Sequence, residues 1–177
     1  MYNLFSNVSI YSIQRTPNPM SDSVKIVDLF CGMGGFHLGI SQACHEHAQT
    51  SECVLASDID TFACQTYKAN FDIEPKGDIT KMKAEDVPPH DILCGGFPCQ
   101  SFSSIGKREG FEHATKGTLF FEVCRLLKHH QTPVCFLENV AGLLTHNKGD
   151  TFATICRTLK ELGYHIHYKV LDVADFG

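Results

Sequence analysis

Cys99 lies in a sequence context that suits a chemically reactive thiol. It follows an apolar run at residues 91–94 that is typical of a buried strand, and two glycines that end the strand. Pro98 restricts the backbone just before the thiol, and the polar, basic stretch 101–110 follows it. A thiolate in this place could act as a nucleophile. The alternative is a packed cysteine in a tight turn, which is the commoner use of a free thiol.

Glu138 is the matching candidate for an acid. It directly follows the apolar run 133–137, which predicts the next strand of the same sheet. Neighbouring parallel strands end at the same edge of a sheet, where α/β proteins bind their ligands. Cys99 and Glu138 therefore predict one crevice that holds a nucleophile and a carboxyl acid. The alternative for Glu138 is an exposed carboxylate in a surface loop.

A glycine-rich turn at residues 31–35 predicts a nucleotide-type ligand beside this pair. It lies between an expected strand and an expected helix, and its spacing differs from the strict pattern of dinucleotide enzymes. Asp58 follows about 20 residues later, the offset at which such folds bind ribose hydroxyls, so we assign it to the ligand. Asp60 is expected to cap the next helix. Asp78 suits either contact with the ligand's base or a capped turn.

Strands alternate with helices along the rest of the chain. The expected strands are 24–30, 53–60, a short one ending at 77–80, 91–94, 133–137 and 164–173, and the expected helices are 36–44, 61–70, 118–130 and 151–162. This alternation predicts an α/β fold with a doubly wound, mostly parallel sheet. Residues 1–23 contain two X-Pro steps and a Ser/Asp cluster, which predict a flexible lead-in.

The composition predicts one globular domain. The chain has 177 residues, of which 43% are hydrophobic, and a formal net charge of −5. That charge argues against indiscriminate nucleic-acid binding by the whole chain, although a local basic loop is compatible with it. Nine cysteines without a repeated CxxC pair favour a reduced, cytosolic protein, and no metal site is predicted. The sequence shows neither a secretory signal nor an apolar run of membrane-spanning length.

Five segments in order resemble the C5-cytosine-specific DNA methyltransferase family, and the resemblance covers residues 24–177. They are Asp-Leu-Phe-Cys-Gly-Met-Gly-Gly-Phe at 28–36, Gly-Asp-Ile at 77–79, Gly-Phe-Pro-Cys-Gln-Ser-Phe-Ser at 96–103, Gly-Thr-Leu-Phe-Phe at 117–121 and Glu-Asn-Val at 138–140. The resemblance implies a Rossmann-like fold and methyl transfer from S-adenosyl-L-methionine to C5 of cytosine in double-stranded DNA, leaving S-adenosyl-L-homocysteine. It also implies a restriction-modification system in the bacterial cytoplasm, with DNA and no membrane as partner.

The same resemblance implies a role for individual residues. Cys99 would attack C6 of a cytosine flipped out of the duplex, and Glu138 would hold or protonate N3 of that base. The cofactor would be bound by Phe30, Gly32, Met33, Gly35, Asp58, Ile59, Asp78, Ile79, Pro98 and Leu119. A loop would contact the DNA through Gln100, Ser101, Ser103, Lys107 and Arg108. Ile59 stands where the family often has a larger aromatic side chain, so it would pack on the adenine without stacking.

The family pattern continues beyond the segment at 171–177. We therefore expect residues 24–177 to be a catalytic domain that lacks its last strands, the target-recognition domain and the C-terminal helix. A second chain that supplies the C-terminal half is one possible partner. Two alternatives remain open at this point: a non-catalytic fragment that binds S-adenosylmethionine or regulates a partner, and a dinucleotide-dependent oxidoreductase that does not use Cys99.

Overall fold

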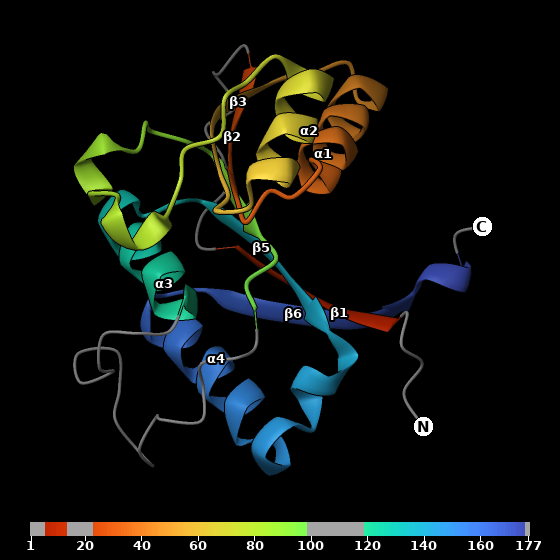
Figure 1. Cartoon of the computed structure of the whole chain (residues 1–177). Helices are drawn as coiled ribbons and strands as arrows, with labels where there is room; N and C mark the ends of the chain where they lie inside the picture. The colour runs from red at the N-terminus through yellow and green to blue at the C-terminus, as the bar shows by residue number, and fades with distance from the viewer. Residues whose placement is uncertain (1–5, 14–22, 99–118, 176–177) are drawn as a thin grey trace.

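A computed structural model of the chain describes residues 6–13, 23–98 and 119–175, which are built around one six-stranded sheet (Figure 1). The strand order is β3-β2-β4-β5-β1-β6. The strands are β1 (Ser6–Ile13), β2 (Ser23–Leu29), β3 (Thr50–Ser57), β4 (Ile92–Gly95), β5 (Val134–Val140) and β6 (His165–Asp172). The pairs β2–β3, β2–β4 and β4–β5 are parallel, which confirms the predicted mostly parallel sheet.

Helices cover both faces of this sheet. They are α1 (Gly35–Glu46), α2 (Thr61–Phe71), α3 (Leu119–His130) and α4 (Asp150–Glu161). Phe36 of α1 packs on Phe136 of β5, whereas Phe152 of α4 packs on Tyr168 of β6. Tyr168 and Leu137 pair with the same residue of β1, so their side chains point to the same face of the sheet. Phe136 precedes Leu137 in β5 and points to the opposite face, because successive residues of a strand alternate between the two faces. The sheet is therefore doubly wound, as predicted. Within the described ranges, no helix is long and apolar enough to cross a bilayer.

The N-terminal strand β1 corrects the expected lead-in. Ser6–Ile13 lies between β5 and β6 and pairs antiparallel with both, so the prediction of a flexible segment is wrong for these residues. Val8 and Ile10 are buried among the core residues beside α3 and α4, whereas Tyr11 and Ile13 point to the other face and are partly exposed. The alternation of these side chains is the period of a strand with one covered face.

The short third strand is a second correction. Lys76 makes a single parallel bridge to Ser57, and the chain then enters a 3-10 turn, Ile79–Lys81, instead of a strand. The Asp78 carboxylate accepts hydrogen bonds from the backbone N–H and the hydroxyl of Thr80 at 2.9 and 2.7 Å. This local capping satisfies the turn internally and ends the pairing with β3.

A buried polar cluster joins β2 to the elements around it. The Asp28 side chain is fully buried, and its carboxyl accepts hydrogen bonds from Cys94 Sγ at 3.7 Å and from the Tyr67 hydroxyl at 3.5 Å. That hydroxyl also lies 2.9 Å from His37 Nδ1 and 3.3 Å from Cys53 Sγ. Burial raises the pKa of Asp28 to about 7, because the charged form loses its hydration.

Ile10 and Ile13 test whether β1 is part of the core. Ile10→Ala is expected to lower the free energy of unfolding by about 2–5 kcal/mol, because a fully buried side chain leaves a cavity. Ile13→Ala is the matched control on the same strand, with 42% of its surface exposed, and should cost much less. Denaturant unfolding of both variants measures this. Equal, small losses would mean that the segment does not pair stably.

Asp28 predicts a pH dependence of stability. Its folded pKa of about 7 exceeds the ordinary value of 3.8, so the folded state binds the proton more tightly. The stability that this proton contributes is complete below pH ~4 and is lost as pH rises through about 7. Asp28→Asn removes the titration, so its stability relative to wild type should improve across this window by up to about 4 kcal/mol. Denaturant unfolding between pH 4 and 8 measures the difference, with the exposed Asp86→Asn as control. A constant difference would contradict the assignment.

Candidate active site at the carboxyl edge of the sheet

The carboxyl ends of three parallel strands bring the candidate residues to one edge of the sheet. Leu29 of β2 pairs with Gly95 of β4, and Gly95 pairs with Leu137 of β5. The glycine turn follows Leu29, the segment 96–98 follows Gly95, and Glu138 follows Leu137. The strand register therefore brings the glycine turn and Glu138 to the same edge of the sheet.

The glycine turn has a backbone that needs its glycines. Gly34 has a φ of 94°, and a Cβ at this position would collide with the ring of Phe71 on α2. Its N–H donates to the carbonyl oxygen of Cys31 at 2.8 Å, which closes the turn just before α1 begins. Gly32 has a φ of 53°, and its N–H donates to Asp58 Oδ2 at 2.9 Å. The turn after β2 is thus tied directly to the end of β3.

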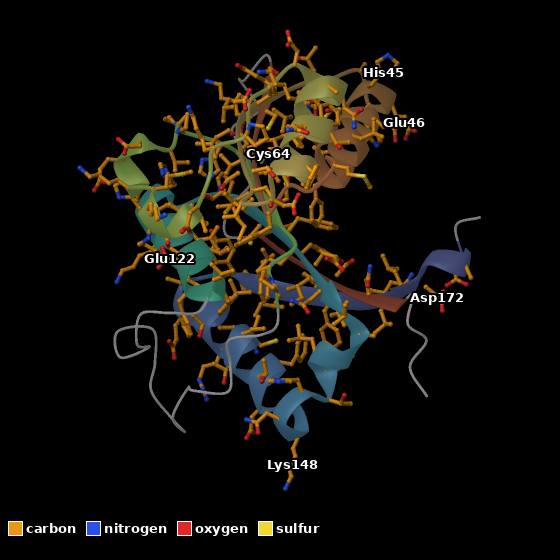
Figure 2. The ribbon with its side chains drawn as sticks, in the orientation of Figure 1. His45, Glu46, Cys64, Glu122, Lys148 and Asp172 are labelled. Carbon is orange, nitrogen blue, oxygen red and sulfur yellow. The ribbon has the colours of Figure 1, made fainter. Side chains whose placement is uncertain are left out.

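Asp58, Ile59 and Asp78 share one cleft of about 740 Å³. The second Asp58 oxygen accepts from the N–H of Asp60 at 2.9 Å, so both oxygens are held by backbone donors. Ile59 is 75% exposed and offers an apolar surface at the cleft. The cleft also contains the thiol-bearing Cys64 of α2, which Figure 2 labels. Its remaining lining residues are Thr61, Gln65, Lys68, Glu74, Pro75, Gly77 and Lys81.

The two other aspartates of this region act as caps. Asp60 accepts from the N–H of Ala63 at 2.8 Å and begins α2, as predicted. Asp78 caps the turn after it, which was one of its two predicted roles, while it also lines the cleft. Lys81 lies 3.8 Å from the Asp78 carboxylate, and Lys68 forms an ion pair with Glu74. The mouth of the cleft therefore carries both signs of charge.

Glu138 differs from its predicted position in one respect. It lies within β5, not beyond its end, because pairing with β1 extends the strand to Val140. The side chain is half-buried, which corrects the alternative of an exposed loop carboxylate, and burial raises its pKa above the ordinary value. A Cβ on Gly96 would lie 2.9 Å from Glu138 Oε2, so a larger residue at this position would displace the Glu138 carboxyl.

Asn139 is a site residue to which the sequence analysis assigned no role. Its buried amide Nδ2 donates to the carbonyl oxygen of Phe97 at 2.6 Å and ties the end of β5 to the segment after β4. Phe97 itself is buried and packs on Phe120 of α3. The Glu-Asn-Val segment was already singled out in the sequence, but only the fold shows which backbone group its amide reaches.

The other predicted site residues either lie in the described part of the chain or fall outside it. Phe30 has a φ of 54° and packs against the core, Met33 and Pro98 are exposed, and Leu119 is the first residue of α3. Among the described residues, no cluster of three or more His, Cys, Asp or Glu side chains could hold a metal ion. The nucleophile and the predicted DNA loop lie outside the described residues: Cys99, Gln100, Ser101, Ser103, Lys107 and Arg108.

Known proteins that are longer than this chain match most of it at high sequence identity. The Type II methyltransferase M.MspI of Moraxella sp is 48% identical over 168 residues, which are 95% of this chain and 39% of that protein. The Type II methyltransferase M.HhaI of Haemophilus parahaemolyticus is 42% identical over 154 residues, which are 87% of this chain and 45% of that protein. The chain thus spans less than half the length of these two relatives.

Two solved structures share the fold of this chain, and a family model gives its family. A mutant of Spodoptera frugiperda DNMT2 superposes with a TM-score of 0.57 and 26% identity, over 78% of this chain and 41% of that one. The S. pombe Dnmt2 methyltransferase, 23% identical, shares the fold with a TM-score of 0.57, over 80% and 41%. The family model described as "C-5 cytosine-specific DNA methylase" matches residues 24–177. This match covers the whole described site and all of the sheet except β1 and the first residue of β2, and the chain belongs to that family of S-adenosylmethionine-dependent methyltransferases.

Proposed function

We propose that this chain forms the catalytic and cofactor-binding part of a DNA methyltransferase. The enzyme transfers a methyl group from S-adenosylmethionine to C5 of cytosine in double-stranded DNA through a covalent adduct with Cys99. The observation that carries the proposal is the junction between β4 and β5. There Asn139 holds the carbonyl of Phe97, two residues before Cys99, while Gly96 admits the half-buried Glu138 carboxyl.

The described residues fit the cofactor chemically. The cleft has the size of a small-molecule site, and ligand pockets combine apolar walls with a few placed polar groups. Asp58 would accept hydrogen bonds from the ribose hydroxyls, Ile59 would pack on the adenine face, and Asp78 with Ile79 would border the adenine edge. Phe30, Gly32, Met33 and Gly35 would line the path to the methyl group, which Pro98 and Leu119 would close. The bound cofactor supplies an electrophilic methyl group on a sulfonium.

In the proposed reaction, the Cys99 thiolate forms a bond to C6 of the flipped cytosine. Glu138 gives its proton to N3, which neutralises the charge that develops on the ring. Its raised pKa suits this step, because a carboxyl must carry a proton to donate one. C5 then becomes a carbon nucleophile and takes the methyl group. Loss of the C5 proton to a base breaks the bond to Cys99, and N3 returns its proton to Glu138.

Recognition of the DNA completes the proposal. Gln100, Ser101, Ser103, Lys107 and Arg108 would contact the DNA backbone near the flipped base, since phosphate contacts position a protein without reading sequence. Residues 24–177 form the catalytic domain, and a further region, on the same or a second chain, reads the target. The greater length of the relatives supports this division. Their designation as Type II methyltransferases supports a role in restriction-modification.

Cys99→Ser tests the proposed adduct. Transfer of labelled methyl groups to DNA by the complete gene product should fall to background, because a serine hydroxyl is a far weaker nucleophile than a thiolate. The affinity for S-adenosylhomocysteine should stay unchanged. Cys156→Ser on α4 is the matched control and should keep full activity. Undiminished transfer by Cys99→Ser would refute the adduct. Cofactor binding without any transfer by the wild type would favour a regulatory module.

Glu138→Gln should lower kcat by roughly 10²–10⁴-fold, the usual range for a lost general acid.

Asp58→Asn tests the assignment of the ribose site. The variant keeps the size of the side chain but loses the carboxylate, so the Kd for S-adenosylhomocysteine should rise roughly 10-fold or more. Asp60→Asn is the control two residues away, because asparagine caps a helix as well as aspartate does. Isothermal titration calorimetry measures both affinities. The assignment is wrong if the two variants bind equally well.

A further inference from the structure

Helix α3 directs polar side chains at a backbone segment more than 40 residues away in sequence. Arg125 donates through one terminal nitrogen to the carbonyl oxygens of Ile79 and Met82, at 3.1 and 2.9 Å. Its Nε donates to Glu122 Oε2, one turn earlier on the helix, at 2.8 Å. Figure 2 labels Glu122 on α3. Farther along α3, His130 donates to the carbonyl oxygen of Ala84 at 2.9 Å.

The carbonyls that Arg125 binds belong to the turn at residues 78–82. At its start, the Asp78 side chain caps the backbone through Thr80. At its end, the N–H of Met82 donates to the carbonyl of Ile79 at 3.2 Å, and Arg125 donates to that same carbonyl and to the carbonyl of Met82. A guanidinium suits these two acceptors, because each of its terminal nitrogens carries two N–H donors. The turn is therefore held at both ends.

The same turn forms a wall of both clefts beside the sheet edge. Asp78 and Lys81 line the cleft that also contains Asp58 and Ile59. With Met82 they line a second cleft of about 320 Å³ next to it. Arg125 lines neither cleft. It holds the backbone of the turn, whose Ile79 side chain is buried in the core, and through this backbone it can act on a ligand in the cleft.

We propose that Arg125, oriented by Glu122, is a positioning residue for the adenine side of the S-adenosylmethionine site. The inference rests on the proposed function. It assigns to the guanidinium the task of fixing the position of Asp78 and Ile79 before the ligand binds. A turn that is already in place loses less conformational freedom on binding, and preorganisation of this kind raises affinity. Replacement of Arg125 should therefore weaken cofactor binding by more than its effect on stability explains.

The test compares Arg125→Ala, Arg125→Lys and wild type by calorimetric titration with S-adenosylhomocysteine. We expect the Kd to rise on the order of 10-fold for Arg125→Ala, because two charge-assisted hydrogen bonds are lost. The rise should be smaller for Arg125→Lys, which keeps a charge but not the fork of donors. Hydrogen exchange gives a second readout. The amides of Lys81 and Met82, which bond within the turn, should exchange faster in unliganded Arg125→Ala and slow again when ligand binds.

Arg157→Ala is the matched control. Arg157 lies on α4 and contacts Thr154 of its own helix, so its loss should change neither Kd nor exchange in the turn. Arg125→Lys keeps the test decisive if Arg125→Ala does not fold. The inference is overturned if a folded Arg125 variant loses stability but binds S-adenosylhomocysteine with wild-type affinity. Failure of the wild type itself to bind the ligand would instead overturn the proposed function, and the inference with it.

Discussion

The register of three parallel strands is the constraint on which the site depends. Leu29, Gly95 and Leu137 lie side by side across β2, β4 and β5, so the segments that follow them leave the same edge. Small residues keep this edge open. A Cβ on Gly95 would press on the carbonyl of Leu29, and one on Gly96 would press on the Glu138 carboxyl. A one-residue shift of register would turn Glu138 to the opposite face of the sheet.

Desolvation acts on two carboxyl groups in this region, the fully buried Asp28 and the half-buried Glu138, with different consequences. Desolvation raises the pKa of both Asp28 and Glu138. Asp28 is enclosed by Cys94 and Tyr67 below the glycine turn, where a neutral carboxyl can be satisfied by weak donors. Glu138 is only half-buried and lies at the open edge, where a retained proton can be passed to a ligand. Burial depth thus separates a structural carboxyl from a candidate acid.

The walls of the cleft that contains Asp58 and Asp78 are held by groups outside it. The Gly32 N–H binds Asp58 from the neighbouring turn, and Arg125 binds the 78–82 turn from behind. In the same way, the Asn139 amide holds the segment before Cys99 by donating to a backbone carbonyl oxygen. Each of these contacts joins a side chain to a backbone group of another element. Such bonds fix loop positions without using side chains that the ligand needs, which is how a rigid scaffold can carry a site on loops.

The amino-acid sequence by itself determined the features that rest on neighbouring residues. Apolar runs predicted the parallel strands and the helices within a few residues, Asp60 predicted a helix start, and the glycines predicted the turn after β2. These depend on local periodicity, capping and backbone freedom. The positions of Cys99, Glu138 and Asp58 after expected strands, together with the family motifs, led to the roles that we propose for them.

Only the tertiary structure decided what depends on partners distant in the chain. The side chains of β1 alternate between a buried and a more exposed face, but the place of β1 between β5 and β6 requires two partners far along the sequence. The same pairing extends β5 past Glu138. The raised pKa of Asp28 needs the enclosure formed by α2 and β4, and the hydrogen bonds of Arg125 need a turn more than 40 residues away. Hydrogen bonds and desolvation between distant segments arise from packing, and no local pattern encodes which groups will meet.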